Sequence, residues 1–313
     1  MTAAGEDGVS APQASGSGVA AAPEQTAGSA RVGQPPGWSR AAVRRLLRTP
    51  GAALGGVMFA AVLAAVVVGP WLSPYHPAAV GAGPRLTPPG PQHLLGTDEL
   101  GRDLLSRVLH GGRVTLQVAF GVVLTAASLG SLAGLWLGYR GGSWDSLGMR
   151  MVDVALTFPA LVLAMALAAV LGPSLRNAML AVAAVQLPRY VRLMRGEALR
   201  LKEREFVLAA RALGVGDRQI LLRHLLPNAL PVLLVYATLG LGESTLAVAS
   251  LSFLGLGAQP PTPEWGALVN AGRPYLLDQW WYPTAPGLAL FVTVTALNLL
   301  GDALRQHLDP RMR

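Results

Sequence analysis

The sequence contains no cysteine and a single lysine, Lys202, while its other 24 basic residues are arginines. Without cysteine the chain has no disulfide, no thiolate metal site and no cysteine nucleophile. A Walker A loop needs Gly-Lys-Ser/Thr, because the lysine reaches the phosphates and the hydroxyl holds magnesium. Lys202 lies in Leu-Lys-Glu. We therefore expect the chain to bind no ATP in that way and to carry no cofactor of its own.

Charged residues are scarce, at 13%, whereas 52% of the residues are hydrophobic and the mean hydropathy is +0.43. This composition is too apolar for an ordinary soluble domain. The formal net charge of +8 has two interpretations, a nucleic-acid surface or the cytoplasmic loops of a membrane protein. The arginines flank apolar runs instead of lining one face of a soluble domain, which favours a lipid bilayer and no nucleic acid as partner.

Apolar runs predict an all-α integral membrane protein with six transmembrane helices, since a bilayer requires about 20 residues per helix. The fourth run is uncharged only over 177–188. We therefore expect Arg189 and Arg192 at its cytoplasmic end, where arginine reaches the interface. The predicted spans are 51–72, 114–139, 154–171, the run that begins at 177, 230–254 and 286–300.

The first 37 residues are rich in Ala, Gly, Ser, Pro and Gln and predict a disordered tail without the pattern of a signal peptide. Residues 38–48 predict a short basic helix before the first span. We expect 38–113 to form the first transmembrane helix with an external loop and an amphipathic helix. We expect residues 114–313 to form a five-helix core.

The basic residues predict the orientation of the six spans. With the N-terminus inside, the inside segments hold 19 Lys and Arg residues and the outside segments hold six. Inside loops of membrane proteins are enriched in Lys and Arg. Both termini and the segment 205–228 are therefore expected in the cytoplasm, and the chain is expected to be a multi-pass protein of the cell (inner, cytoplasmic) membrane.

Residues 205–228 are charged and helical and lie between apolar spans. Phe206, Ala209, Ala210 and Leu213 recur at helical spacing and predict one apolar stripe on a helix that ends at Gly214. The sequence then predicts a second helix over 218–226, with Asp217 as its N-cap and Pro227 as its stop. Two interpretations stay open: a docking surface for a soluble partner, or an interfacial hairpin that only joins two spans.

This segment resembles the conserved cytoplasmic loop of binding-protein-dependent ABC importer permeases. The family pattern is Glu-Ala-Ala, three residues, Gly, nine residues, Ile, one residue, Leu-Pro. Five positions match it: Ala209, Ala210, Gly214, Leu226 and Pro227.

Two positions depart from the family pattern, because Leu208 replaces its Glu and His224 replaces its Ile. The nearby Glu205 is a possible substitute for the missing carboxylate. His224 in Arg-His-Leu-Leu-Pro-Asn is similar to the second permease of the dipeptide, oligopeptide and nickel branch. The resemblance implies an ATPase-coupling loop at 195–229, with these site residues: Glu205, Ala209, Ala210, Arg211, Gly214, Asp217, His224, Leu226 and Pro227.

Two further strings resemble the same branch. In LLGTDELGRDLLSRVLHGG, residues 94–112, Thr97 predicts the N-cap of an amphipathic helix that Gly111 and Gly112 end. Its acids, Asp98, Glu99 and Asp103, suit either a solvated helix face or, less well, a cation site.

The other string is SLSFLGLGAQPPTPEWGALV, residues 250–269, in which Gly255 and Gly257 break the fifth span. Trp265, Trp280, Trp281 and Tyr282 suit an interfacial aromatic belt, or stacking on substrate. With the asparagine-to-aspartate string at 298–302 and the closing residues 308–311, the resemblance covers most of 94–311.

Small and acidic residues inside the spans leave further alternatives open. Gly130, Gly134 and Gly138 share one helix face, which suits packing within the chain or a seam with a second permease. Glu243 suits either the translocation path or a hydrogen bond between helices. Asp153 suits an ordinary charge at a helix end.

The resemblance implies the fold of a type I ABC importer permease, similar to the methionine-importer permease, and a non-catalytic subunit. It also implies a second homologous permease chain, two ATPase subunits that bind ATP, and an external substrate-binding protein. The solute would be a dipeptide, an oligopeptide or a related solute such as nickel. A self-contained secondary transporter or channel is the alternative. An enzyme is not favoured, because the chain has no HExxH pair and no GxSxG elbow.

Overall fold

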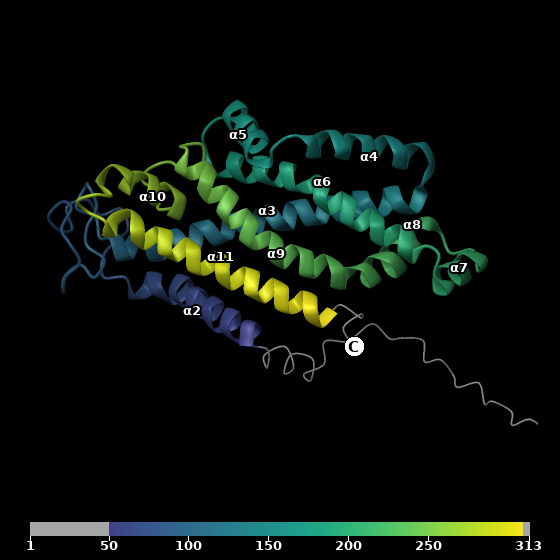
Figure 1. The fold of residues 1–313 in the computed structure, drawn as a ribbon, viewed down its shortest axis with the longest axis horizontal. Helices are drawn as coiled ribbons and strands as arrows, with labels where there is room; N and C mark the ends of the chain where they lie inside the picture. The colour runs from purple at the N-terminus through teal and green to yellow at the C-terminus, as the bar shows by residue number, and fades with distance from the viewer. Residues whose placement is uncertain (1–49, 309–313) are drawn as a thin grey trace, which may run out of the picture. The chain divides into compact units, whose positions relative to one another are not determined.

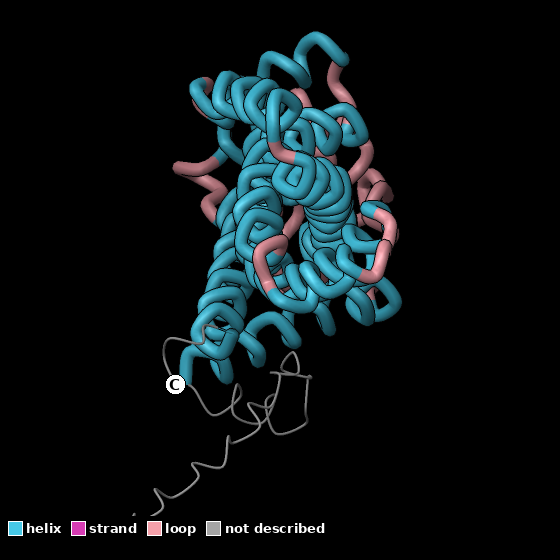
Figure 2. Tube along the Cα trace, turned by 90° about the vertical axis from the view of Figure 1, so that its right-hand side faces the viewer, coloured by secondary structure: helices cyan, strands magenta, loops and turns pink. Residues whose placement is uncertain are grey.

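The computed structural model describes residues 50–308, so the predicted tail over 1–37, the basic helix over 38–48 and most of the closing motif lie outside it. The described residues form helices and loops, with one isolated bridge between Thr97 and Asp103 in place of any strand (Figure 2). The helices are α2 Pro50–Leu72, α3 Leu104–Arg140, α4 Gly142–Thr157, α5 Ala160–Leu171, α6 Leu175–Leu201, α7 Glu205–Ala212, α8 Asp217–Gln219, the π-helix η1 Ile220–Leu225, α9 Leu226–Phe253, α10 Trp265–Gly272, the 3₁₀ turn η2 Arg273–Tyr275 and α11 Trp281–Leu308.

Four helical runs in the described part are long and apolar enough to cross a bilayer: α2, α3, the run Asp217–Phe253 and α11. The bent pair of α4 and α5 would make a fifth. Helix α6 has 27 residues but carries several arginines, so it falls outside this group. The predicted all-helical membrane fold is confirmed, and the number of six spans stays a prediction.

The predicted third span, 154–171, is not one straight helix. Its chain bends by 93° between α4 and α5. Phe158 has extended backbone angles (φ −80°, ψ 140°), and Pro159 precedes the first residue of α5. A residue before proline is disfavoured in the α-region because of the proline ring. The bend therefore follows from Pro159, which the apolar pattern alone does not register.

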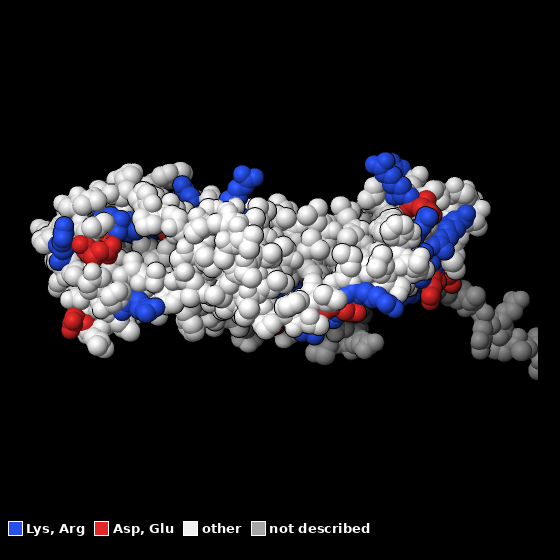
Figure 3. Space-filling model, turned by 90° about the horizontal axis from the view of Figure 1, so that it is seen from above, with Lys and Arg blue, Asp and Glu red and all other residues white. Residues whose placement is uncertain are grey.

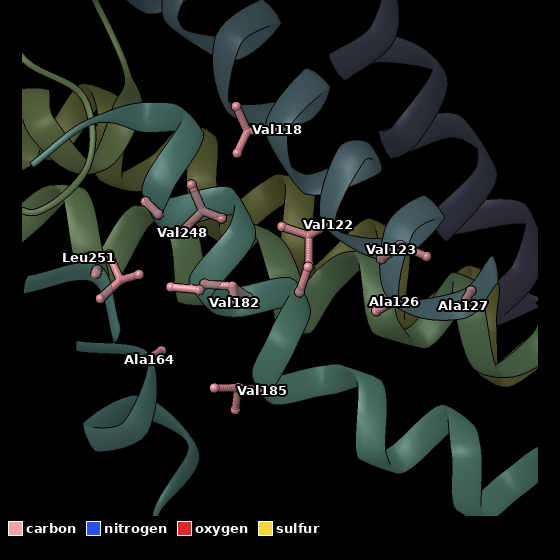
Figure 4. Packing of buried hydrophobic residues seen from close by; sticks show 14 of the residues in the cluster. Val118, Val122, Val123, Ala126, Ala127, Ala164, Val182, Val185, Val248 and Leu251 are labelled. Atoms are coloured by element: carbon pink, nitrogen blue, oxygen red, sulfur yellow. The ribbon is translucent and has the colours of Figure 1, made fainter. Parts of the chain in front are cut away.

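Small side chains fill the main core, which joins α3, α5, α6 and α9 (Figure 4). Val122 and Ala126 of α3 meet Val182 of α6 and Val248 of α9 in this cluster, and all four are fully or almost fully buried. Association of helices in a membrane depends on close van der Waals packing, which alanine, valine and glycine permit. The small side chains therefore allow these helices to pack with short distances between their axes.

The glycine stripe of α3 packs within the chain, against α6. A Cβ atom built on Gly134 would lie 2.3 Å from the carbonyl oxygen of Val191. One on Gly130 would lie 2.6 Å from Cβ of Tyr190, and one on Gly138 would lie 2.7 Å from the carbonyl oxygen of Arg195. Of the two open interpretations, packing within the chain accounts for all three glycines.

The two ends of the helices carry different segments. Helices α7 and α8 lie at one end, whereas α10 and the 73–103 loop lie at the opposite end (Figure 1). Helix α11 packs against α2, α9 and α10. On the face that Figure 3 shows, most charged side chains gather toward the two ends, and the surface between them carries few. Such a band is what a chain that crosses a bilayer requires.

Replacing Gly134 with alanine should lower the stability of the folded chain by about 1–3 kcal/mol, because the methyl group overlaps the backbone of α6. The measurement is the thermal unfolding midpoint of the purified protein. Gly196→Ala is the control, since a Cβ there meets nothing within 4 Å. Equal midpoints for the two variants would contradict this account of the stripe.

Candidate functional site

Helix α7 ends as the sequence predicts. Gly214 has φ +76°, in the left-handed region that glycine adopts without strain. The amide of Val215 donates to the carbonyl of Ala210 (3.0 Å), and that of Gly214 donates to Arg211 (2.9 Å). These two bonds make a Schellman motif, which satisfies the last carbonyls of the helix. The predicted role of Gly214 as the left-handed end of this helix is confirmed.

The predicted apolar stripe of this segment faces outward, except for Ala210. The buried residues of α7 are Val207 and Ala210, which pack with Ile220 and Leu225 of η1 and with the ends of α3 and α6. Phe206, Ala209 and Leu213 are exposed. Spacing alone does not identify the inward face of an eight-residue helix, because its two apolar faces overlap.

Apolar side chains therefore point outward from α7. Leu213 is 83% exposed and Leu208, at the position of the family's glutamate, is 51% exposed. The exposed Glu205 and Arg211 lie on the same short helix. Exposed apolar side chains with a charged rim are typical of a surface that a partner covers.

Tyr139, near the end of α3, bonds to both short helices of the segment, α7 and α8. Its hydroxyl donates to Oδ1 of Asp217 (2.8 Å) and accepts from Nε of Arg211 (3.3 Å). The Arg211 guanidinium carbon also lies 4.7 Å from the centre of the Tyr139 ring, a cation–π contact. The sequence analysis missed Tyr139, because it reads as the last residue of an apolar span.

Asp217 and Pro227 do not have their predicted roles. Asp217 is the first residue of α8, after the N-cap position at Gly216, and its carboxylate accepts from Tyr139. Pro227 does not stop a helix, since α8, η1 and α9 form one continuous run from Asp217 to Phe253. Proline is tolerated in the first turn of a helix, and Pro227 lies in the first turn of α9.

The π-helix η1 connects α7 and α8 to the long helix α9. The amide of Leu226 donates to the carbonyl of Leu221, five residues back, as a π turn requires. His224 lies in η1 with its ring 6.5 Å from that of Phe206, and its carbonyl accepts from the side-chain amide of Asn228 (2.6 Å). The histidine in place of the family's isoleucine thus contacts α7.

Glu243, the candidate residue of the translocation path, pairs with Arg189. The carboxylate of Glu243 in α9 accepts from the guanidinium of Arg189 in α6. Arg189 does not lie at the end of its helix, because α6 continues to Leu201. Arg192, one turn further along α6, pairs with Asp153 of α4. The helix therefore continues for about three turns past Arg189, and the interfacial position of these arginines stays a prediction.

The 94–112 string forms no helix before Leu104. Gly96 and Gly101 have positive φ, +80° and +69°. Oδ1 of Asp98 accepts from the amides of Leu100 and Arg102, both at 2.9 Å. Such local bonds compete with a helix. The N-cap of α3 is Asp103, which accepts from the Ser106 amide at 2.8 Å, and not Thr97.

Two of the three acids of this string, Asp98 and Asp103, are buried instead of solvated, and Glu99 is partly exposed. Asp98 is fully buried and pairs with Arg102 (2.5 Å) and Arg107 (3.4 Å). Asp103 pairs with the ring of His93 (2.9 Å). Arginine partners occupy these carboxylates, and within residues 50–308 no group of three or more metal-binding side chains is placed to hold an ion. The string therefore fastens the 73–103 loop onto α3.

Gly111 and Gly112 do not end a helix, because α3 runs on to Arg140. A Cβ on Gly112 would lie 2.5 Å from the Trp265 ring. Trp265 is buried and donates from Nε1 to the carbonyl of Val108 (2.8 Å). Tyr282 is buried as well and donates to Glu99. The belt prediction is wrong for these two aromatics, while Trp280 is exposed.

Glu264, beside Trp265, is a buried carboxylate that joins α10 to α3. It caps α10 by accepting from the amide of Ala267 (3.0 Å), and it accepts from the Thr115 hydroxyl of α3 (3.0 Å). Burial raises the pKa of this carboxyl above its ordinary value. The predicted break after the fifth span is confirmed, since α9 ends at Phe253 and Gly255 has φ +81°.

Comparison with known proteins assigns the family. Residues 130–313 match the family described as "Binding-protein-dependent transport system inner membrane component". Residues 38–89 match the "N-terminal TM domain of oligopeptide transport permease C". The chain belongs to this family of inner-membrane permeases, as its loop motif predicts, and the self-contained secondary transporter is not favoured.

The named relatives are permease proteins of transport systems. The chain is 47% identical over 255 residues to the probable D,D-dipeptide transport system permease protein DdpC of Escherichia coli K12, covering 82% of this chain and 86% of the relative. It is 42% identical over 268 residues to the di/tripeptide transport system permease protein DppC of Pseudomonas aeruginosa UCBPP-PA14 (83% and 88%). It is 43% identical over 276 residues to the glutathione transport system permease protein GsiD of Escherichia coli O1:K1 (86% and 89%).

Replacing Tyr139 with phenylalanine should loosen α7 and α8 from α3 while leaving the ring under Arg211. Losing the hydroxyl costs about 1 kcal/mol, so opening of this segment should become about fivefold more frequent. The measurement is hydrogen exchange of residues 205–218 in the purified protein. Tyr75→Phe is the control, since its hydroxyl contacts Gln92 in the 73–103 loop. Unchanged hydrogen exchange in Tyr139→Phe would contradict the role of the Tyr139 hydroxyl in holding α7 and α8 on α3.

Proposed function

We propose that this chain is a non-catalytic permease subunit of an ATP-driven importer and forms half of the path for short peptides or related solutes. Support comes from relatives whose names specify dipeptide, di/tripeptide and glutathione transport. The proposed partners are a second homologous permease, two ATPase subunits that bind the ATP, and an external binding protein that delivers the solute.

The 195–229 segment is proposed as the docking surface for an ATPase subunit. This proposal rests on the apolar side chains that point outward from α7. Leu208 and Leu213 are largely exposed on a segment that lies at one end of the helices, away from the uncharged band (Figures 1 and 3). An eight-residue helix with exposed leucines gains most when a soluble partner covers them. A connecting hairpin alone would not require outward leucines.

Displacement of α7 by the ATPase would be transmitted to the membrane helices through two connections. One is the contact of Tyr139 with Arg211 and Asp217, which joins the segment to α3. The other is the continuous run from Asp217 through η1 into α9. Closure of two ATPases would then move α3 and α9 as rigid bodies and alternate access to a central path.

The proposed topology places α7 and both chain termini in the cytoplasm and the 73–103 loop outside. The excess of Lys and Arg in the segments on the side of α7 supports this orientation. The opposite placement of α7 and the 73–103 loop along the helices supports their lying on different sides of the bilayer (Figure 1).

Replacing Gly214 with proline should uncouple transport from ATP hydrolysis. Proline fixes φ near −65° and lacks the amide that donates to Arg211, so the Schellman motif cannot form. Uptake by the reconstituted complex should fall at least tenfold, while membrane insertion and ATP hydrolysis by the ATPase subunits persist. The measurement is solute uptake per ATP hydrolysed.

Gly216→Pro is the matched control for that experiment. Gly216 lies two residues further on with φ −66° and ψ 148°, angles that proline adopts readily. It should retain uptake close to that of the unmodified complex. Full uptake by Gly214→Pro would refute the coupling role of this turn.

A further inference from the structure

Arg189 and Glu243 form their ion pair far from the ends of both helices. Arg189 follows Leu175 of α6 by 14 residues and precedes Leu201 by 12. At 1.5 Å per residue, it lies about 21 and 18 Å from the two ends. Glu243 follows Leu226 of α9 by 17 residues and precedes Phe253 by 10, which is about 26 and 15 Å. The pair is therefore near the middle of the helices.

Both side chains are open to the surroundings at that depth. The side chain of Glu243 is 52% exposed and that of Arg189 is 34% exposed. The Arg192–Asp153 pair lies one turn along α6, and its side chains are more than half exposed. A charged side chain in hydrocarbon costs several kcal/mol, and charges within spans face protein or water-filled cavities. This face of α6 and α9 is therefore not a lipid face.

Polar and aromatic residues lie within two helical turns of the pair, and the polar ones, Ser244 and Gln186, are buried. The Ser244 hydroxyl, next to Glu243, donates to Gln186 (3.1 Å), which lies one turn before Arg189 on α6. Tyr236, two turns before Glu243 on α9, is partly exposed and packs edge-on against Tyr190 at 5.2 Å. A carboxylate near an aromatic ring suits an ammonium group, and a guanidinium suits a carboxylate.

We propose that Arg189 and Glu243 line the solute path and exchange their mutual ion pair for the two ends of a zwitterionic solute. Arg189 would take a carboxylate and Glu243 an ammonium group, as a short peptide with free termini presents. This inference rests on the importer function proposed above. The Arg189–Glu243 ion pair must break before the solute forms its two ion pairs, and this cost offsets part of the binding energy. The solute is therefore held weakly, as a conducting site requires.

The absence of cysteine from the chain gives a direct test of water access. Glu243→Cys adds the sole thiol of this chain, and the assembled complex in nanodiscs is treated with a trimethylammonium-ethyl methanethiosulfonate reagent. We expect modification of this chain, slowed severalfold when solute-loaded binding protein and ATP are present. Val57→Cys on α2 is the control. Val57 is 69% exposed, but it lies on an apolar helix. A thiol there does not ionise to the thiolate that reacts with the reagent. An unreactive Glu243→Cys, covered by lipid or by the second permease, would overturn the proposal.

A charge-neutralisation cycle separates a solute contact from a structural ion pair. Arg189→Gln, Glu243→Gln and the double variant are assayed for uptake and ATP hydrolysis in proteoliposomes. If the pair only joins α6 to α9, each single variant leaves one charge without its partner and lowers uptake. The double variant removes both charges and should then recover uptake. If the pair meets solute, uptake falls about tenfold in each single variant and at least as far in the double variant, while ATP hydrolysis continues.

Arg195 and Asp145 provide the matched control pair. Arg195 of α6 donates two bonds to Asp145 of α4, at 2.6 and 2.7 Å, and its double variant, Arg195→Gln with Asp145→Asn, should recover uptake. Full uptake in the Arg189 and Glu243 variants beside a working unmodified complex would refute this inference alone. An unmodified complex without ATP-dependent uptake would refute the importer function itself.

Discussion

Close contact between α3 and α6 is the constraint on which the rest of the structure depends. The glycines of α3 let its backbone approach the stretch of α6 from Leu187 to Ala198. A bilayer supplies no hydrophobic force between helices, so such backbone proximity supplies the packing energy instead. With one face of α6 held against α3, its arginines at 189, 192 and 195 are directed to α9 and α4, where their acidic partners lie.

The same contact positions the segment proposed to meet the ATPase. Tyr139 follows Gly138 directly, so the approach of α3 to α6 also fixes where the Tyr139 hydroxyl meets Arg211 and Asp217. The buried residues of α7 and η1 complete a small core on the ends of both helices. A short helix that could not be stable alone is thereby fixed in orientation, with its leucines outward.

The sequence allowed some features to be predicted, because they depend on local chemistry or on length. Apolar runs identified the helical membrane fold, and glycine at 214 and 255 identified two helix ends through the left-handed region. Three predictions failed where a long-range contact decides. Gly111 and Gly112 make room for Trp265, Pro227 is accommodated after a π turn, and Asp98 is occupied by arginines. The orientation of α7 was not predicted, because it follows from its contacts with η1. The bend at Pro159 is local and could have been predicted from the residue before proline.

The charges of α6 and the string 94–112 show two different uses of ion pairs. Asp98 and its arginines are almost fully buried, so desolvation opposes their separation and no solvent competes for them. Such a pair fixes the loop to α3 permanently. Arg189 and Glu243 are half exposed at mid-helix, where water or a solute can replace either partner at little cost. Ion pairs that are to open during transport must remain partly solvated. On this criterion the pairs of Arg189 and Arg192 are separable, and those of the 73–103 loop are not.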